Sequence, residues 1–186
     1  MIHKTAIIDL KAKVSDNAKV GAYSVIGPNV EIGEGTEIQS HVSIIGNTKI
    51  GKNNKIYPFA SIGNDPQDLK FNGEQTNLQI GNNNKIREYV TINPGTIGGG
   101  GITKVGNNCL FMVSSHIAHD CMVGNNVILA NNVPLGGHAI IEDTLLFVIF
   151  GAKEVLARLE FFICVVFTGL QRGQLRVSRL GVRLGC

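Results

Sequence analysis

Residues 8–62 read IDLKAKVSDNAKVGAYSVIGPNVEIGEGTEIQSHVSIIGNTKIGKNNKIYPFASI. Every sixth position of this stretch holds an aliphatic side chain: Ile8, Val14, Val20, Ile26, Ile32, Ile38, Ile44, Ile50, Ile56 and Ile62. A period of six fits neither the 3.6-residue helix nor the two-residue alternation of a plain strand. Short strands joined by tight turns, three to a coil, repeat in this way, so the stretch predicts a parallel β-helix built from hexapeptides.

The same period continues beyond this stretch with two interruptions. It resumes at Ile80 and, shifted by one residue, runs from Val105 to Ile141. Residues 63–79 and 93–104 break the inward aliphatic rule, so we expect them to leave the coil as loops. Small residues recur four positions after the aliphatic residues and would fill the narrow interior of the coil. Asn-rich pairs suit turn positions with positive φ. Residues 1–143 therefore read as one repeat domain.

The composition changes abruptly after Asp143. All asparagines of the 186-residue chain precede this point, and the formal net charge of +3 is carried by residues 144–186. Because the charge does not belong to the repeat domain, we expect neither a nucleic-acid partner nor stable membrane insertion. The apolar run of residues 161–170 is shorter than the roughly 20 residues that span a bilayer. We expect residues 144–186 to be a non-repeat tail, poorly ordered or partly helical.

The cysteines and the N-terminus bear on the compartment. The four cysteines form neither a CxxC pair nor a dense disulfide framework, which is typical of a reducing compartment. The first residues lack the apolar segment of a secretory signal. The sequence therefore predicts a cytoplasmic protein.

The densest group of reactive side chains is residues 114–121, SSHIAHDC, which lie in unbroken repeat. His119 falls at a turn, and residues 18 apart stack in a three-strand coil, so Gly137 should lie on the next coil above it. A histidine beneath a glycine N–H forms a workable pair of general base and oxyanion donor. Asp120 could hold the imidazole in one tautomer.

The histidines and the two inserts also allow other interpretations. An isolated surface histidine is usually solvated and has no functional role. Three of the five histidines of this chain lie within one and a half coils, and this clustering favours a functional role. A zinc site of His116, His119 and His138 is the rival functional hypothesis, and it suits the spacing poorly because Ile117, between the first two, points inward. The first insert, residues 63–79, either binds a ligand, as loops on a rigid scaffold often do, or is an ordinary solvated loop. The glycine-rich second insert lacks the lysine spacing of a phosphate-binding loop.

Several motifs together resemble the acyl-[acyl-carrier-protein]:UDP-N-acetylglucosamine O-acyltransferases. They are Gln67-Asp68-Leu69-Lys70, Ile102-Thr103-Lys104-Val105-Gly106, His116-Ile117-Ala118-His119-Asp120-Cys121, Ile128-Leu129-Ala130-Asn131-Asn132 and Gly136-Gly137-His138. The resemblance covers residues 1–143. It implies a left-handed parallel β-helix, a homotrimer with active sites between subunits, and transfer of an (R)-3-hydroxyacyl chain from acyl carrier protein to the 3-hydroxyl of UDP-N-acetylglucosamine, the first step of lipid A biosynthesis.

The resemblance also implies roles for individual residues. His119 would be the general base, supported by Asp120, and the Gly137 N–H would stabilise the oxyanion. The substrate-binding residues would be Gln67, Asp68, Lys70, Asn93, His116 and His138, with Asn93 standing where many members have a histidine. Attack of a hydroxyl on a thioester needs one base and one oxyanion donor, so we expect no cofactor and no metal.

The tail departs from this family, which continues the coils and ends in a helical domain. We therefore expect a truncated or frameshifted member with impaired activity, the alternative being a divergent natural cap. Two other functions stay open: the related hexapeptide N-acyltransferase, whose acceptor carries a 3-amino group, and a noncatalytic trimeric scaffold. In the family that the chain resembles, selectivity for acyl-chain length depends on residues beyond Asp143.

Overall fold

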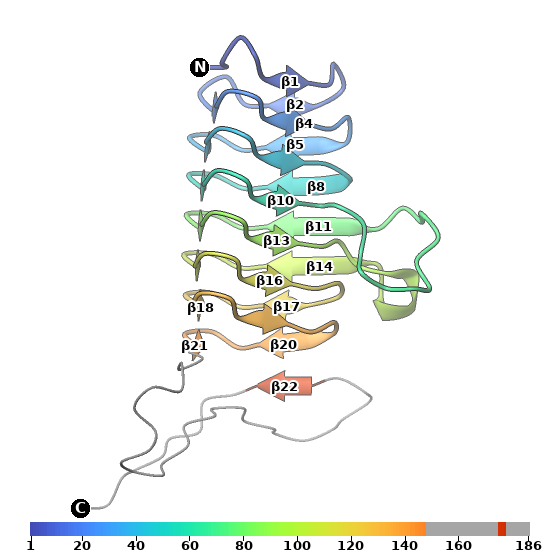
Figure 1. Ribbon diagram of the computed structural model, residues 1–186. Helices are drawn as coiled ribbons and strands as arrows, with labels where there is room; N and C mark the ends of the chain where they lie inside the picture. Colours follow the sequence, from blue (N-terminus) through green and yellow to red (C-terminus); the bar gives the residue numbers. More distant parts are fainter. Residues whose placement is uncertain (148–174, 178–186) are drawn as a thin grey trace, which may run out of the picture.

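The structure is a computed structural model that describes residues 1–147 and 175–177. Its strands wind into a three-sided column, with one strand on each side in every coil (Figure 1). Most strands are only two residues long, because a turn follows after each inward aliphatic residue. All strand pairs within each sheet are parallel, so the column is the predicted parallel β-helix.

Three sheets form the sides of the column. The first sheet contains β1 (Ile7–Ile8), β4 (Val25–Ile26), β7 (Ser43–Ile44), β10 (Ser61–Ile62), β13 (Thr91–Ile92), β16 (His116–Ile117) and β19 (Pro134–Leu135). The second contains β2 (Lys13–Val14), β5 (Val30–Ile32), β8 (Asn47–Ile50), β11 (Asn77–Ile80), β14 (Ile102–Val105), β17 (Met122–Val123), β20 (Ala139–Ile141) and β22 (Leu175–Val177). The third contains β3 (Lys19–Val20), β6 (Glu37–Ile38), β9 (Lys55–Ile56), β12 (Lys85–Ile86), β15 (Leu110–Phe111), β18 (Ile128–Leu129) and β21 (Leu146–Phe147).

The core is a set of stacked aliphatic side chains inside the column. In the first sheet Ile62 pairs with Ile92, Ile92 with Ile117, and Ile117 with Leu135. The three isoleucines are fully buried. Burial of one such side chain stabilises the fold by about 1.5–3 kcal/mol. The predicted small residues are also buried, among them Ser24, Thr36, Ala60, Ser115 and Cys121.

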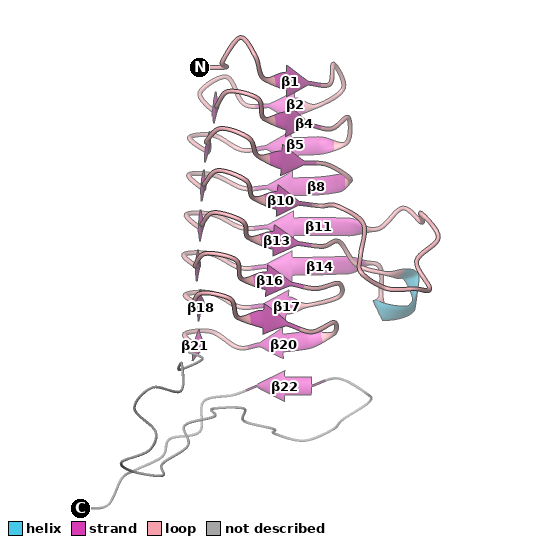
Figure 2. Ribbon diagram, viewed as in Figure 1, coloured by secondary structure: helices cyan, strands magenta, loops and turns pink. Residues whose placement is uncertain are grey.

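Both inserts leave the column at the same corner, between the first and the second sheet. The first runs from residue 63 to 76 and the second from residue 93 to 101, where it contains the short 3-10 helix η1 (Ile97–Gly99), cyan in Figure 2. The loops therefore end three residues earlier than predicted. β11 and β14, like β8, are four residues long, and they bury Leu78 and Thr103 before the six-residue period resumes.

The coil also continues past the predicted boundary at Asp143. β21 pairs in parallel with β18, and Phe147 opposes Leu129, so one further strand of the repeat is present. β22 pairs with β20 and extends the second sheet. Residues 146–147 of the predicted non-repeat tail thus continue the coil and residues 175–177 form a strand, while residues 148–174 and 178–186 lie outside the described residues. Among residues 1–147 and 175–177, no helix is both long and apolar enough to cross a bilayer.

Candidate active site

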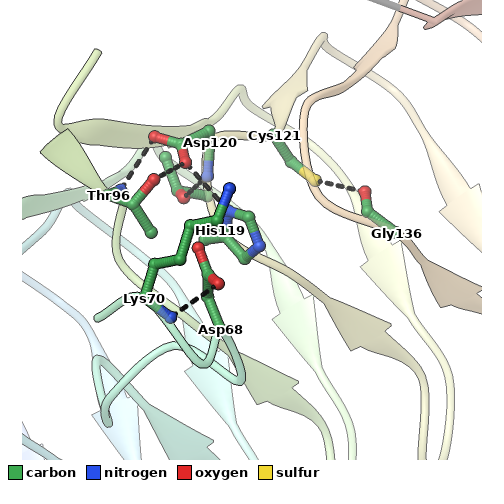
Figure 3. A network of polar contacts seen from close by, with 8 residues as sticks. Asp68, Lys70, Thr96, His119, Asp120, Cys121 and Gly136 are labelled. Carbon is green, nitrogen blue, oxygen red and sulfur yellow. Dashed lines mark hydrogen bonds and ion pairs between the residues drawn. The ribbon is translucent and has the colours of Figure 1, made fainter. Parts of the chain in front are cut away.

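Four successive coils bring the predicted site residues to one corner of the column. The first insert follows β10, the second follows β13, the turn with His119 follows β16, and the turn with Gly137 follows β19. These four strands are consecutive neighbours in the first sheet. Because parallel strands in register end at the same edge, residues from 63 to 138 in the sequence reach a single edge. Figure 3 shows part of this corner.

Asp120 is the most buried charged group at this corner, with no exposed side-chain surface. Its carboxylate accepts hydrogen bonds from the N–H of Thr96 at 2.9 Å and from the Thr96 hydroxyl at 2.6 Å (Figure 3). The Asp120 N–H donates to Thr103 Oγ1 at 2.8 Å. Gly99 lies directly over the carboxylate, where a Cβ would approach Asp120 Oδ2 to 2.1 Å. The second insert therefore covers Asp120 and excludes water from it.

His119 is oriented by this carboxylate. Its Nδ1 lies 2.9 Å from Asp120 Oδ2, and 16% of its side chain is exposed. An ionised carboxylate only accepts hydrogen bonds, so Nδ1 carries the proton and donates it. In this tautomer Nε2 carries no proton and has a free lone pair. The pair has the geometry of a general base and its orienting group.

Gly137 packs against the ring of His119, as the 18-residue stacking predicts. A Cβ at this position would lie 2.6 Å from Cε1 and 2.7 Å from Nε2 of the imidazole. Only glycine therefore lets the backbone approach Nε2 so closely. Among the described residues, the Gly137 N–H has no backbone acceptor, which leaves it available to a ligand.

The two other predicted histidines flank His119. The rings of His119 and His138 meet edge to face with centroids 5.1 Å apart. His116 lies on β16 between Thr91 and Pro134 of the neighbouring strands, and its Nδ1 is 2.6 Å from Thr91 Oγ1. Burial, with a smaller contribution from His119, lowers the pKa of His116 below its usual 6.5. Burial thus favours the neutral form of His116.

The residues predicted to bind substrate on the first insert are mostly accessible. Gln67 and Lys70 are exposed and Asp68 is half-buried. The Lys70 N–H donates to Asp68 Oδ1 at 3.0 Å, which ties the two residues together within the loop. Figure 3 draws this pair in the same close view as His119.

Asn93 differs from the other predicted ligands because it is buried. Only 5% of its surface is exposed, and its side-chain amide contacts the first insert instead of facing outward. The expected direct contact between Asn93 and substrate is therefore at odds with its burial.

A metal would find few free ligands here. His119, Asp120 and His138 each offer an atom within 4.8 Å of the others. However, Thr96 already donates to both Asp120 oxygens, and one of these oxygens also accepts from His119. A bound ion would have to break that hydrogen-bond set. His116 is not part of the group, so the rival three-histidine zinc set does not come together.

Sequence reasoning missed two residues of the site, Thr96 and Thr103. Both contact Asp120 from the preceding coil. Thr103 lies in the 102–106 motif without having been assigned a role, whereas Thr96 lies in none of the motifs. The second insert itself was the available signal, because its glycine-rich run allows a close approach to the corner. Only the path of the loop shows that it approaches the aspartate.

Comparison with known proteins agrees with this architecture. Residues 11–46 and 102–143 match the family described as bacterial transferase hexapeptide (six repeats). The chain is 51% identical, over 142 residues, to the acyl-[acyl-carrier-protein]–UDP-N-acetylglucosamine O-acyltransferase of Thermodesulfovibrio yellowstonii, which covers 76% of this chain and 55% of the relative.

Two solved structures are also similar. LpxA from Acinetobacter baumannii superposes with a TM-score of 0.77 at 50% identity, and UDP-N-acetylglucosamine O-acyltransferase (LpxA) from Moraxella catarrhalis with 0.76 at 53%. Each match covers 78% of this chain and 56% of the other. The chain thus spans about half the length of the relatives it matches. The column is a left-handed parallel β-helix, and the chain belongs to the hexapeptide-repeat transferases, in the family of the UDP-N-acetylglucosamine O-acyltransferases.

Proposed function

We propose that this chain carries the catalytic corner of an acyltransferase that moves an (R)-3-hydroxyacyl chain from acyl carrier protein to the 3-hydroxyl of UDP-N-acetylglucosamine, the first step of lipid A biosynthesis. The observation that carries the proposal is the buried Asp120 carboxylate, which orients His119 beneath Gly137. The relatives named above support this choice, since the name of the Thermodesulfovibrio relative specifies acyl carrier protein and UDP-N-acetylglucosamine, and that of the Moraxella structure specifies UDP-N-acetylglucosamine.

The proposed reaction begins with proton removal by His119. Its Nε2 takes the proton of the sugar hydroxyl while the hydroxyl oxygen bonds to the thioester carbonyl carbon. The carbonyl electron pair moves onto oxygen, and the Gly137 N–H donates a hydrogen bond to this oxyanion. When the carbonyl re-forms, the C–S bond breaks and the sulfur takes the proton from His119 as the carrier thiol. Asp120 stays ionised and stabilises the transient imidazolium.

Substrate binding would use the groups around this pair. Gln67, Asp68 and Lys70 lie on an accessible loop that leaves the same corner, and Lys70 supplies a positive charge suited to the diphosphate. His116 and His138 flank His119 and can donate or accept hydrogen bonds from the sugar or the acyl carbonyl. The proposed assembly is a homotrimer, and the proposed location is the cytoplasm, where acyl carrier protein would be the donor.

The test is acyl transfer from a purified (R)-3-hydroxyacyl carrier protein to UDP-N-acetylglucosamine, followed by mass spectrometry of the product. Transfer by the unmutated chain, and its loss on His119→Ala with the thermal unfolding temperature unchanged, are expected. An acceptor with a 3-amino group, assayed in parallel, tests the related N-acyltransferase. If a folded chain transfers to neither acceptor, the proposal that this chain is active is refuted, and either the scaffold hypothesis or a truncated or frameshifted member with impaired activity is favoured.

A further inference from the structure

Asn93 is the first residue of the second insert, directly after β13, and its side chain contacts the first insert from one coil away. Its Nδ2 donates to the carbonyl oxygen of Asn64 at 3.0 Å and to that of Asp65 at 3.1 Å. Both hydrogens of the amide are therefore used. The opposite orientation would point the amide oxygen at two carbonyl oxygens, so the assignment of Nδ2 follows from the contacts.

These two hydrogen bonds hold a loop that has little other attachment. The Gly63 N–H makes the last regular bond of the column, to Ile92 O, and the Asn77 N–H makes the next one, to Gly101 O. Between them, among the described residues, every hydrogen bond that reaches residues 64–76 from another coil comes from Asn93. The Asn64 side chain adds one bond to the Ser61 hydroxyl of β10, three residues earlier in the chain.

The held carbonyls lie just before the recognition residues of the loop. Pro66 follows Asp65, is buried and has a restricted φ, and Gln67, Asp68 and Lys70 come next. Fixing the two carbonyls therefore fixes the direction in which the chain enters this segment. Asn93 itself does not face a ligand, because its Oδ1 is buried without a hydrogen-bond partner.

We infer that Asn93 is a positioning residue, which places the 63–76 loop and its Asp68–Lys70 pair over the His119 corner, and that it does not contact substrate. The loop-holding part of this inference is independent of the reaction, while its effect on catalysis rests on the proposed function. In this arrangement the start of the second insert holds the first insert, and Asp120 holds the second insert through Thr96.

The test compares Asn93→Asp with Asn93→Ala. Aspartate keeps the shape of the side chain but places a carboxylate oxygen against the Asn64 and Asp65 carbonyls, whereas alanine removes the contact. Trypsin cleavage after the exposed Lys70, followed by peptide mass spectrometry, reports loop release without requiring activity. We expect cleavage to accelerate about tenfold or more in Asn93→Asp, since two hydrogen bonds are lost and local opening becomes easier.

Kinetics supply the second measurement. Because His119, Asp120 and Thr96 are untouched, KM for the UDP-sugar should rise several-fold while kcat changes little. Asn54→Asp is the matched control: Asn54 is a buried asparagine at another corner, hydrogen-bonded to Gly81 and Asn84. This control should lower stability without accelerating cleavage at Lys70 relative to cleavage elsewhere.

Each outcome bears on the inference. Unchanged cleavage at Lys70 in both Asn93 variants overturns it, and a higher KM with unchanged cleavage points instead to a direct substrate contact. If alanine releases the loop and aspartate does not, Asn93 only fills space and the hydrogen-bond role is wrong. If the unmutated chain transfers no acyl group but Asn93→Asp still releases the loop, the proposed function fails while the positioning role stands.

Discussion

Substitution of Gly137 by alanine would test the proposed catalytic corner with a single methyl group. The φ angle of Gly137 is not in the left-handed region, so alanine can adopt this backbone without strain. The added Cβ would instead meet the imidazole of His119, at 2.6 Å from Cε1, 2.7 Å from Nε2 and 3.2 Å from Nδ1. The conflict is therefore confined to the catalytic ring.

The size of the effect follows from these distances. Ordinary contact begins at 3.4 Å, so the ring would have to move by about 0.8 Å at Cε1. Nδ1 is held by Asp120, so the free edge that carries Nε2 must move most. A misplacement of about 1 Å typically costs about 10²-fold in rate, and we expect kcat to fall by that order. KM should change little, because the groups on the first insert are unaffected.

The assay is steady-state acyl transfer, with thermal unfolding measured on the same samples. Gly136→Ala is the matched control, since a Cβ there meets nothing within 4 Å. It should retain the activity of the unmutated chain. If Gly137→Ala keeps kcat within about threefold while the control behaves as expected, Gly137 does not define the position of His119 and the assigned geometry is wrong.

Three further results are expected. Thr96→Val removes the hydroxyl donor to buried Asp120, so the free energy of unfolding measured in urea should fall by about 1.5–3 kcal/mol, and kcat should fall as well. The control is Thr48→Val, which loses a neutral hydrogen bond to a backbone carbonyl and should leave kcat unchanged. Burial raises the pKa of Cys121 to about 11, so peptide mapping should find it unlabelled by iodoacetamide at pH 8 until the protein is unfolded; native labelling would contradict its burial. The pKa of His116 is lowered on folding, so the unfolded state takes up the proton first as pH falls below about 6.5, and stability is lost from there down to the folded pKa. His116→Gln should flatten this part of the curve of unfolding temperature against pH, and an unchanged slope would show that another group is responsible.

The repeat of six explains why so much could be predicted from the sequence. Each coil contacts only its neighbours, so the inward position of Ile117 and the stacking of Gly137 over His119 follow from spacing alone. The two inserts were also recognisable, because an interrupted period marks where the chain leaves the column. Phe147 lies six residues after Ile141 and opposes Leu129, so the period extends by one strand beyond Asp143.

The contacts of the inserts could not be predicted, because loops carry no period that relates spacing to position. The Thr96 hydroxyl donates to Asp120, and the Asn93 amide donates to a neighbouring loop. Both contacts depend on the path of irregular backbone, which brings together residues that are distant in the sequence. The hexapeptide pattern thus determines the column and the alignment of its corner residues, since both arise from short-range stacking. How the site is covered and how its recognition loop is held depend on hydrogen bonds between segments 24 to 29 residues apart, which form only once the column has brought those segments together.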